Sequence, residues 1–337
     1  MGNGLNLAQM GVSPRANFSC YAMETNVSAD LNEPLTIEPG LIALFRTPFR
    51  VDEFWTQSLG TLHDEKLADS SLLLMAFSEQ ASKPELDRRV SALWYALLIQ
   101  ERAYSVNGLK LAGTNTGNGL HIDSGGTLSD FYRSPKVVAE PIELESLRLA
   151  ASAASGISAI YQRQDGQHYL RLRKGFNAFL RGLQEGTDAD FRLHQFVRAV
   201  EAVMKPRTGR TKKDFVHRGQ LFAGRSPADR NVLEQLFDMR SVSEHLNPLE
   251  DLFDQLSGHD RESIIADRVF QSEILAGSIY ARLMTDPALL EAFRTEDAIA
   301  EFWQKPDDEQ IEIWGRAIDL EGEIEHKFGY LSRHRLG

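Results

Sequence analysis

The chain has 337 residues, of which 42% are hydrophobic and 25% are charged, and its formal net charge is −11. This length exceeds the size at which a single hydrophobic core keeps growing, so we expect more than one globular domain. The acidic balance argues against a general nucleic-acid coat protein. No apolar run approaches the roughly 18 residues that cross a bilayer, and the polar first residues lack a signal-peptide core, so we expect a soluble, cytoplasmic protein.

The first half of the chain carries mixed signals. Residues 1–38 are rich in Asn, Gly and Ser and end at the turn sequence EPG, which predicts a loosely ordered N-terminal arm. The short apolar runs LIALFR and SLLLMAFSE fit strands or buried helix segments. Residues 84–102 and 142–162 have helical spacing, and the Gly- and Thr-rich segment between them indicates short strands with turns. We therefore expect a small α+β domain over residues 39–165.

The second half, residues 166–337, is predicted to be all-α. Asp188 or Asp190 can cap a helix whose apolar residues form one stripe as far as Met204. A second helix is expected after the cap Ser226, with Leu233, Leu236, Met239 and Val242 facing inward. Further helices follow, with a break at Asp286-Pro287 and a last helix between residues 307 and 326. The predicted fold is thus an α+β domain followed by a helical bundle.

A basic segment stands out in this acidic chain. Between Arg163 and Arg230, Lys and Arg outnumber Asp and Glu by about two to one, and the densest part is KPRTGRTKKDFVHR, residues 205–218. One interpretation is a solvated basic loop. The other is a surface that binds the phosphates of RNA, because clustered cations supply sequence-independent affinity. The candidate RNA-binding residues are Lys205, Arg207, Arg210, Lys212, Lys213 and Arg218.

The sequence LFDMRSVSEHLNP places Arg240 and His245 five residues apart near the end of the second helix. At 3.6 residues per turn the two side chains point about 140° apart, so they are not an ordinary surface pair one turn apart. Either the pairing is accidental, or both side chains reach one site from different sides.

Three features occur in order along this half of the chain. A helix ends in the Glu-bearing turn FVRAVEAVM, a basic loop contains the F-x-x-R element of Phe215 and Arg218, and a helix has the pattern L-x-x-L-F-D-M-R-S-x-x-x-H. Together they resemble the HEPN superfamily, and within it the Apea-like HEPN domains. The resemblance covers about residues 191–303, a third of the chain.

The resemblance implies an all-α HEPN domain and an RNA-related function. Many HEPN proteins are metal-independent endoribonucleases that leave 2′,3′-cyclic phosphate ends, and Apea-like domains are often found in prokaryotic defence or toxin-like roles. By this match Arg240 and His245 are the catalytic residues, with Ser241 and Glu201 supporting them. The family also implies RNA as a partner, no cofactor, and a homodimer in which two such helices line a shared groove. The lone cysteine, Cys20, has no metal-ligand neighbours, so no metal site is expected.

The chemistry of RNA cleavage fits this pair of residues. A histidine titrates near neutral pH and can donate or accept a proton, and an arginine can stabilise a pentacovalent phosphorane with its planar fork of donors. Pro248 disfavours a helical Asn247, so we expect His245 in the last helical turn, where the carbonyl end of the helix favours a positive charge. His245 then suits the role of general acid. Its neighbour Glu244 either raises the pKa of that imidazole or is simply solvated.

Two residues depart from the family pattern. Ser241 stands where the nucleases often have Asn, Asp or His, and Leu246 stands where Apea-like members often have Gly. The alternative interpretation is that Arg240 bonds Glu201 on the neighbouring helix, that His245 caps a helix end, and that the domain is a non-catalytic module for nucleic-acid binding or scaffolding. A third possibility is an effector-sensing pocket in the N-terminal domain.

Overall fold

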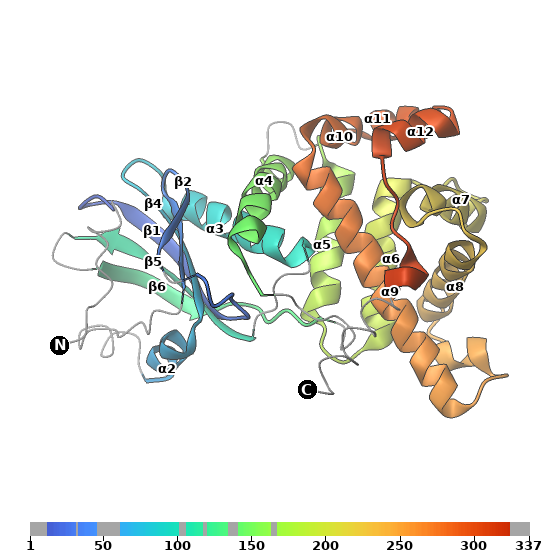
Figure 1. Cartoon of the computed structure of the whole chain (residues 1–337), viewed down its shortest axis with the longest axis horizontal. Helices are drawn as coiled ribbons and strands as arrows, with labels where there is room; N and C mark the ends of the chain where they lie inside the picture. The colour runs from blue at the N-terminus through green and yellow to red at the C-terminus, as the bar shows by residue number, and fades with distance from the viewer. Residues whose placement is uncertain are drawn as a thin grey trace. The chain divides into compact units, whose positions relative to one another are not determined.

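The computed structural model describes residues 12–31, 33–45, 61–100, 106–116, 120–133, 141–162 and 167–323. The chain divides into two compact units. The first comprises Met1–Phe131 and Ala139–Ser158, and the second Tyr132–Val138 and Ala159–Gly337. The first holds a β-sheet with helices and the second holds helices, so the predicted α+β and mostly helical character is confirmed (Figure 1).

A six-stranded antiparallel sheet forms the centre of the first unit, in the order β2-β3-β4-β1-β5-β6. The strands are β1 (Asn17–Glu24), β2 (Leu35–Glu38), β3 (Leu41–Phe45), β4 (Leu72–Ser78), β5 (Val106–Asn115) and β6 (Leu120–Thr127). LIALFR and SLLLMAFSE therefore supply strands and not helix segments. The short strands expected after residue 102 correspond to β5 and β6, which pair with each other.

The expectation of a loosely ordered arm over residues 1–38 is wrong for the strands it contains. Strand β1 lies between β4 and β5, and β2 pairs with β3 at the edge of the sheet. Successive side chains of the strand NFSCYAME point to opposite faces of the sheet, and every residue from Phe18 to Met23 is buried. The polar residues on either side of this segment favoured the prediction of a loosely ordered arm, whereas the structure has a strand that is covered on both faces.

Both faces of the sheet are covered. Phe18, Cys20 and Ala22 point to one face, where they join Ile42, Met75 and Leu111 and the side chain of Leu67 from α2 (Thr61–Asp69). The intervening Tyr21 points to the opposite face, where it bonds Asp87 and Ser91 of α3 (Lys83–Ile99). Helix α3, expected over residues 84–102, begins with a capping box made by Ser82 and Glu85. Helix α4 (Leu144–Tyr161) follows the sheet.

The second unit is a set of helices around an aromatic core. Its helices are α5 (Leu170–Gln184), α6 (Ala189–Met204), α7 (Thr211–Ala223), α8 (Pro227–Glu244), the 3₁₀ turn η1 (Leu249–Phe253), α9 (Gly258–Thr285), α10 (Pro287–Ala292), α11 (Glu296–Phe302) and α12 (Asp307–Trp314). The rings of Phe176, Phe179, Phe196 and Tyr280 contact one another. Gly175 permits this packing, because a Cβ there would lie 2.0 Å from the Tyr280 hydroxyl.

Helices α6 and α8 form as the sequence predicts. Asp188 caps α6 by accepting a hydrogen bond from the Phe191 amide, and Ser226 caps α8 in the same way. Helix α6 contacts α5, α8 and α9. The expected apolar stripes are buried in both helices, except that Val242 is only half-buried. The predicted break at Asp286-Pro287 separates α9 from α10.

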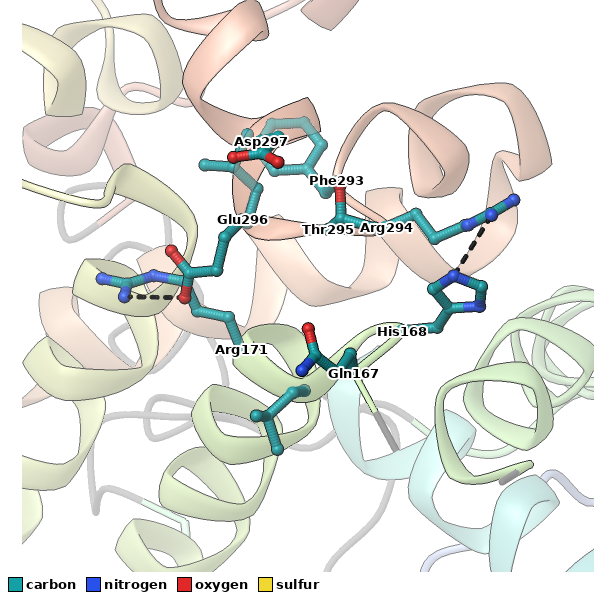
Figure 2. A pocket seen from close by; sticks show the side chains of 10 residues that line it. Gln167, His168, Arg171, Phe293, Arg294, Thr295, Glu296 and Asp297 are labelled. Carbon is teal, nitrogen blue, oxygen red and sulfur yellow. Dashed lines mark hydrogen bonds and ion pairs between the residues drawn. The ribbon is translucent and has the colours of Figure 1, made fainter. Parts of the chain in front are cut away.

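The second unit also contains a buried ion-pair network and a cavity. Glu273 of α9 is 1% exposed and bonds both Arg192 of α6 and Arg133, which fixes the start of this unit to its core. A cavity of about 360 Å³ lies between the beginning of α5 and the turn from α10 to α11 (Figure 2). Across the ranges that the structure describes, the helices are too short or too polar to cross a membrane.

Candidate functional site

Arg240 lies between α8 and α6 and contacts two carboxylates. Its Nη2 donates to Glu201 Oε2 of α6 at 3.1 Å, and its Nη1 lies 2.5 Å from Glu244 Oε2 one turn along α8. The exposed fractions of the side chains are 18% for Arg240, 13% for Glu201 and 37% for Glu244. The contact between Arg240 and Glu201, expected under the non-catalytic interpretation, is therefore present, and Glu244 is the more accessible of the two partners.

His194 joins this group from α6. Its Nε2 lies 3.5 Å from Glu244 Oε1, which is too long for a well-formed hydrogen bond. Because His194 precedes Glu201 by two helical turns, both side chains lie on the face of α6 that meets α8. We call His194, Glu201, Arg240 and Glu244 the Arg240 cluster.

Three buried polar atoms in the Arg240 cluster lack hydrogen-bond partners among the described residues. They are Nε2 of His194, Oε1 of Glu201 and Nε of Arg240. Folded proteins pair nearly all buried polar atoms, because an unpaired one costs about 1–3 kcal/mol. Three such atoms on neighbouring side chains therefore mark a place that can offer both donors and acceptors to a polar ligand.

Burial shifts two ionisable groups of the cluster. It lowers the pKa of His194 below its usual value, helped by the positive charge of Arg198 and opposed by Glu244. It also raises the pKa of Glu201, although the Arg240 guanidinium acts in the opposite direction. The imidazole of His194 is consequently neutral at physiological pH and able to accept a proton.

His245 lies at the end of α8, five residues after Arg240. It is the C-cap residue, which the non-catalytic interpretation expected, and it lies one residue beyond the last helical turn in which the argument from Pro248 had placed it. Its exposed imidazole has no hydrogen-bond or ion-pair partner in the described parts of the chain. The next residue, Leu246, has φ 57° and is 92% exposed. The amides of Leu246 and Asn247 bond the carbonyls of Ser243 and Val242, which closes a Schellman turn.

The predicted basic loop is partly bound to the protein itself. Arg207 donates through Nε and Nη2 to the two oxygens of Asp214, each at 2.7 Å, and its backbone amide bonds the same carboxylate. Asp214 is only 4% exposed, and these bonds hold its pKa far below the usual value. Lys212 pairs with Asp238 on the surface.

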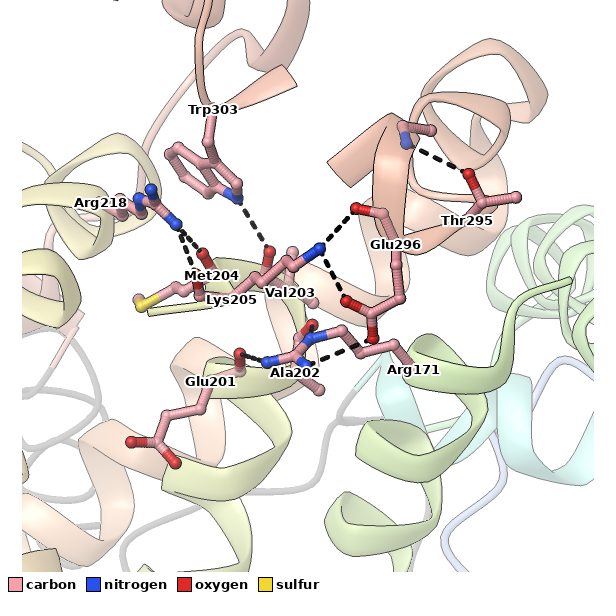
Figure 3. Close-up of polar contacts among 11 residues, drawn as sticks. Arg171, Glu201, Ala202, Val203, Met204, Lys205, Arg218, Thr295, Glu296 and Trp303 are labelled. Atoms are coloured by element: carbon pink, nitrogen blue, oxygen red, sulfur yellow. Dashed lines mark hydrogen bonds and ion pairs between the residues drawn. The ribbon is translucent and has the colours of Figure 1, made fainter. Parts of the chain in front are cut away.

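Two more of the predicted RNA-binding residues, Arg218 and Lys205, make contacts at the carboxyl end of α6 (Figure 3). Arg218 donates to the carbonyls of Met204 and Lys205, both at 2.6 Å, and the Lys205 ammonium pairs with Glu296 of α11. From α5, Arg171 bonds the carbonyls of Ala202 and Glu201. Cations thus satisfy carbonyls that the end of a helix leaves unpaired.

Other predicted residues remain accessible. Arg210 and Lys213 are exposed and have no ion-pair partner among the described residues, and the same holds for Arg198 on α6. Ser241 is half-buried and accepts a backbone hydrogen bond from the His245 amide, with no side-chain bond within the described ranges. The structure brings Arg240 and Glu201 together and leaves the basic residues distributed between internal contacts and solvent.

His194 is the site residue that sequence reasoning missed. The available signal was its spacing of seven residues from Glu201, which places both on one helical face. This spacing indicates a site only once α8 is known to pack against that face of α6.

Comparison of the chain with protein-family models, with curated proteins and with solved structures finds no significant match to any of them.

Proposed function

We propose that the second unit is a HEPN-type endoribonuclease that cleaves RNA without a metal ion and leaves 2′,3′-cyclic phosphate ends. The observation that carries the proposal is the set of unpaired buried atoms around Arg240, next to an imidazole that is neutral at physiological pH. The order of the sequence features in α6, the basic loop and α8, which resembles that of HEPN domains, supports the same proposal.

The residues of the cluster have the chemistry that the reaction needs. A base removes the proton of the RNA 2′-hydroxyl, the 2′-oxygen attacks phosphorus, and the bond from phosphorus to the 5′-oxygen breaks as that oxygen receives a proton. His194 is suited to be the base because burial keeps it unprotonated. His245, which is solvent-exposed, is suited to supply the proton to the leaving group. Arg240 offers its planar donors to the phosphorane.

A phosphate must replace one partner of Arg240 before it can bind there. Glu244 is the partner that can leave, because its side chain is 37% exposed and surface ion pairs contribute only about 0–1 kcal/mol. Glu201 is the partner that stays, because it is largely buried between the helices. A Glu244 released from Arg240 still lies next to His194 and can orient that imidazole.

The same proposal includes a homodimer with Leu246 at its interface. A leucine in the left-handed backbone region is strained by roughly 1–2 kcal/mol. This one is also 92% exposed, so its apolar surface is not used within the described parts of its own chain. Burial against a second copy would offset both costs and would place the accessible His245 of each chain beside a shared groove.

The test is incubation of purified protein with mixed RNA in excess EDTA, with the wild type beside His245→Ala and His194→Gln. His217→Ala is the matched control, because His217 is an exposed histidine on α7 that contacts Asp307. We expect cleavage by the wild type and the control, loss of cleavage in the other two variants, and cyclic phosphate on the new 3′ ends. Absence of RNA cleavage by the wild type would contradict the proposal.

A second candidate function is a non-catalytic RNA-binding or scaffolding module. The specific observation that favours it is the bond from Arg240 to Glu201, which joins α8 to α6 whether or not RNA is present. In that case RNA binds without being cut, and Arg240→Lys lowers the melting temperature. Comparing RNA retention on a filter with cleavage in the same samples separates the two functions.

A further inference from the structure

Helix α6 presents an aromatic side chain beside the Arg240 cluster. Phe191 is 39% exposed, and its ring contacts no other aromatic ring or cation in the described parts of the chain. It lies three residues before His194, and side chains at that spacing are neighbours on a helix, with Cβ atoms about 5–6 Å apart. The start of α6 does not need the ring, because Asp188 accepts its hydrogen bond from the backbone amide of Phe191. Phe191 is therefore an accessible aromatic surface next to the proposed general base.

A cation lies on the other side of His194. Arg198 follows His194 by four residues, is exposed, and has no ion-pair partner among the described residues. Its positive charge acts on both His194 and Glu201, so it lies within electrostatic reach of the cluster. Phe191 and Arg198 are seven residues apart, which is close to two full turns, so they lie on one line along α6. An aromatic ring and an accessible cation thus lie before and after the imidazole along this side of the helix.

A ring and a cation in this arrangement fit a nucleotide of single-stranded RNA. Every nucleobase has a π-face that can stack on an aromatic side chain, and every phosphate is an anion that an arginine can bond. In RNA the base is attached to the ribose carbon next to the one that carries the 2′-hydroxyl. A ribose whose 2′-hydroxyl lies at His194 therefore holds its own base within reach of Phe191, the helical neighbour of that histidine.

We propose that Phe191 stacks on the base of the nucleotide whose 2′-hydroxyl attacks, and that Arg198 bonds a phosphate next to the scissile one. The proposal rests on the proposed cleavage of RNA at the Arg240 cluster and names the nucleotide that this site selects. A purine offers two fused rings and a pyrimidine only one, so stacking favours a purine. Cleavage should therefore occur preferentially on the 3′ side of adenosine and guanosine.

Binding of RNA that cannot be cut measures the stacking contact apart from cleavage. The probes are two nonamers in which fluorine replaces every 2′-hydroxyl, one of uridine throughout and one with a single central adenosine. Fluorescence anisotropy should show that the wild type binds the adenosine nonamer about fivefold more tightly. Phe191→Ala should weaken binding of the adenosine nonamer by roughly fivefold to 100-fold and should bind the two nonamers equally.

Further variants separate stacking from other effects. Phe191→Trp should keep the preference for adenosine, whereas Phe191→Leu, which is apolar but has no aromatic face, should lose it. Arg198→Gln should weaken binding of both nonamers to the same extent, because a phosphate contact carries no base preference, and unchanged binding would remove that contact. Ile311→Ala is the matched control, since Ile311 on α12 is 40% exposed and its loss should change neither affinity. Thermal melting verifies that each variant is folded.

The same nonamers with ordinary ribose report on cleavage. The wild type should cut the adenosine nonamer on the 3′ side of its adenosine, and Phe191→Ala should lose this preference. The stacking proposal is overturned if the wild type binds neither nonamer, if it binds both equally, or if Phe191→Ala keeps the preference, even where RNA is cut. A wild type that prefers adenosine through Phe191 but cuts neither nonamer would refute the nuclease and leave the stacking contact standing.

Discussion

Two arginines of the second unit, Arg207 and Arg240, bind carboxylates in different ways. Arg207 meets both oxygens of Asp214 with two side-chain donors, and its own amide adds a third bond. Arg240 divides its donors between two carboxylates and leaves its Nε without a partner in the described structure. Arg207 thus forms a complete two-donor fork with one carboxylate, whereas Arg240 keeps a donor, Nε, that can still bond a ligand.

This difference distinguishes an arginine whose carboxylate contact is complete from one that can still bond a ligand. A complete fork between arginine and a buried carboxylate fixes the loop before α7, and a phosphate has little to gain by entering it. An incomplete cluster costs free energy in the unliganded protein, and a ligand that supplies the missing bonds recovers that cost. We therefore expect mutations of Arg207 to act on stability and mutations of Arg240 to act on RNA cleavage.

The largest expected effect is on the rate of cleavage. Arg240→Lys keeps the charge but loses the planar fork, and His245→Ala removes the proposed proton donor, so each should slow cleavage by roughly 10²- to 10⁴-fold with little change in RNA affinity. Single-turnover cleavage and filter binding measure the two quantities. If Arg240→Lys lowers only the melting temperature, the contrast with Arg207 disappears.

The next effect is on stability. Asp214→Asn removes the charge that Arg207 bonds, so it should lower the free energy of unfolding by roughly 1.5–3 kcal/mol. Asp238→Asn is the matched control: its partner Lys212 is half exposed, and the change should be within about 0.5 kcal/mol. Urea denaturation at pH 7 measures both, and equal losses would contradict the distinction between complete and surface pairs.

The stabilisation by Asp214 should also depend on pH in a definite direction. Arg207 lowers the pKa of this carboxyl in the folded state, so the unfolded chain binds the proton more readily. The contribution is fully present above the unfolded value near 3.8 and is lost as the pH falls toward the lower folded value. The stability difference between wild type and Asp214→Asn should therefore shrink below about pH 4.

A smaller effect is expected on RNA affinity. Arg210 and Lys213 are accessible, so replacing both by Ala should weaken binding across all sequences and flatten the salt dependence of log K by about 0.7 per lost contact for single-stranded RNA. Arg207→Ala should change the slope less, because its donors are engaged by Asp214. An unchanged slope in the first variant would leave the loop as solvated charge only.

The smallest effect concerns Leu246. Glycine adopts positive φ without strain, so Leu246→Gly should stabilise the isolated chain by about 1 kcal/mol. The same substitution should weaken self-association if Leu246 lies at a dimer interface. Analytical ultracentrifugation and urea denaturation test the two statements separately, and dimerisation that is unaffected by the substitution would remove Leu246 from the interface.

Local patterns predicted much of the fold. Caps, apolar stripes and proline breaks located α3, α6, α8 and the boundary between α9 and α10, because these signals act within a few residues. Strand β1 was missed because both of its faces are buried, so it shows no alternation of apolar and polar residues, and because residues rich in Asn, Ser and Gly surround it. Burial on both faces is decided by α2 and α3, which lie far away in the sequence.

The site was predictable only in part for a similar reason. The contact from Arg240 to Glu201 could be anticipated, since each lies near the end of its helix in the order that the resemblance implies. The proximity of His194 to Glu244 depends on how α6 packs on α8, and no sequence spacing specifies that packing. The charge pattern of the basic loop likewise could not distinguish Arg207, which Asp214 holds, from Arg210, which is free of ion pairs in the described structure.

The pH dependence of RNA cleavage in EDTA, measured for the wild type and for His194→Gln, tests the role of the Arg240 cluster most directly. Because burial lowers the pKa of His194, the wild-type rate should stay high at neutral pH and fall only as the pH drops below about 6.5. The variant should be about 100-fold slower or more, and should lack that fall. A wild type that leaves RNA intact at every pH, or a variant with the wild-type profile, would contradict the assignment of the Arg240 cluster as the cleavage site.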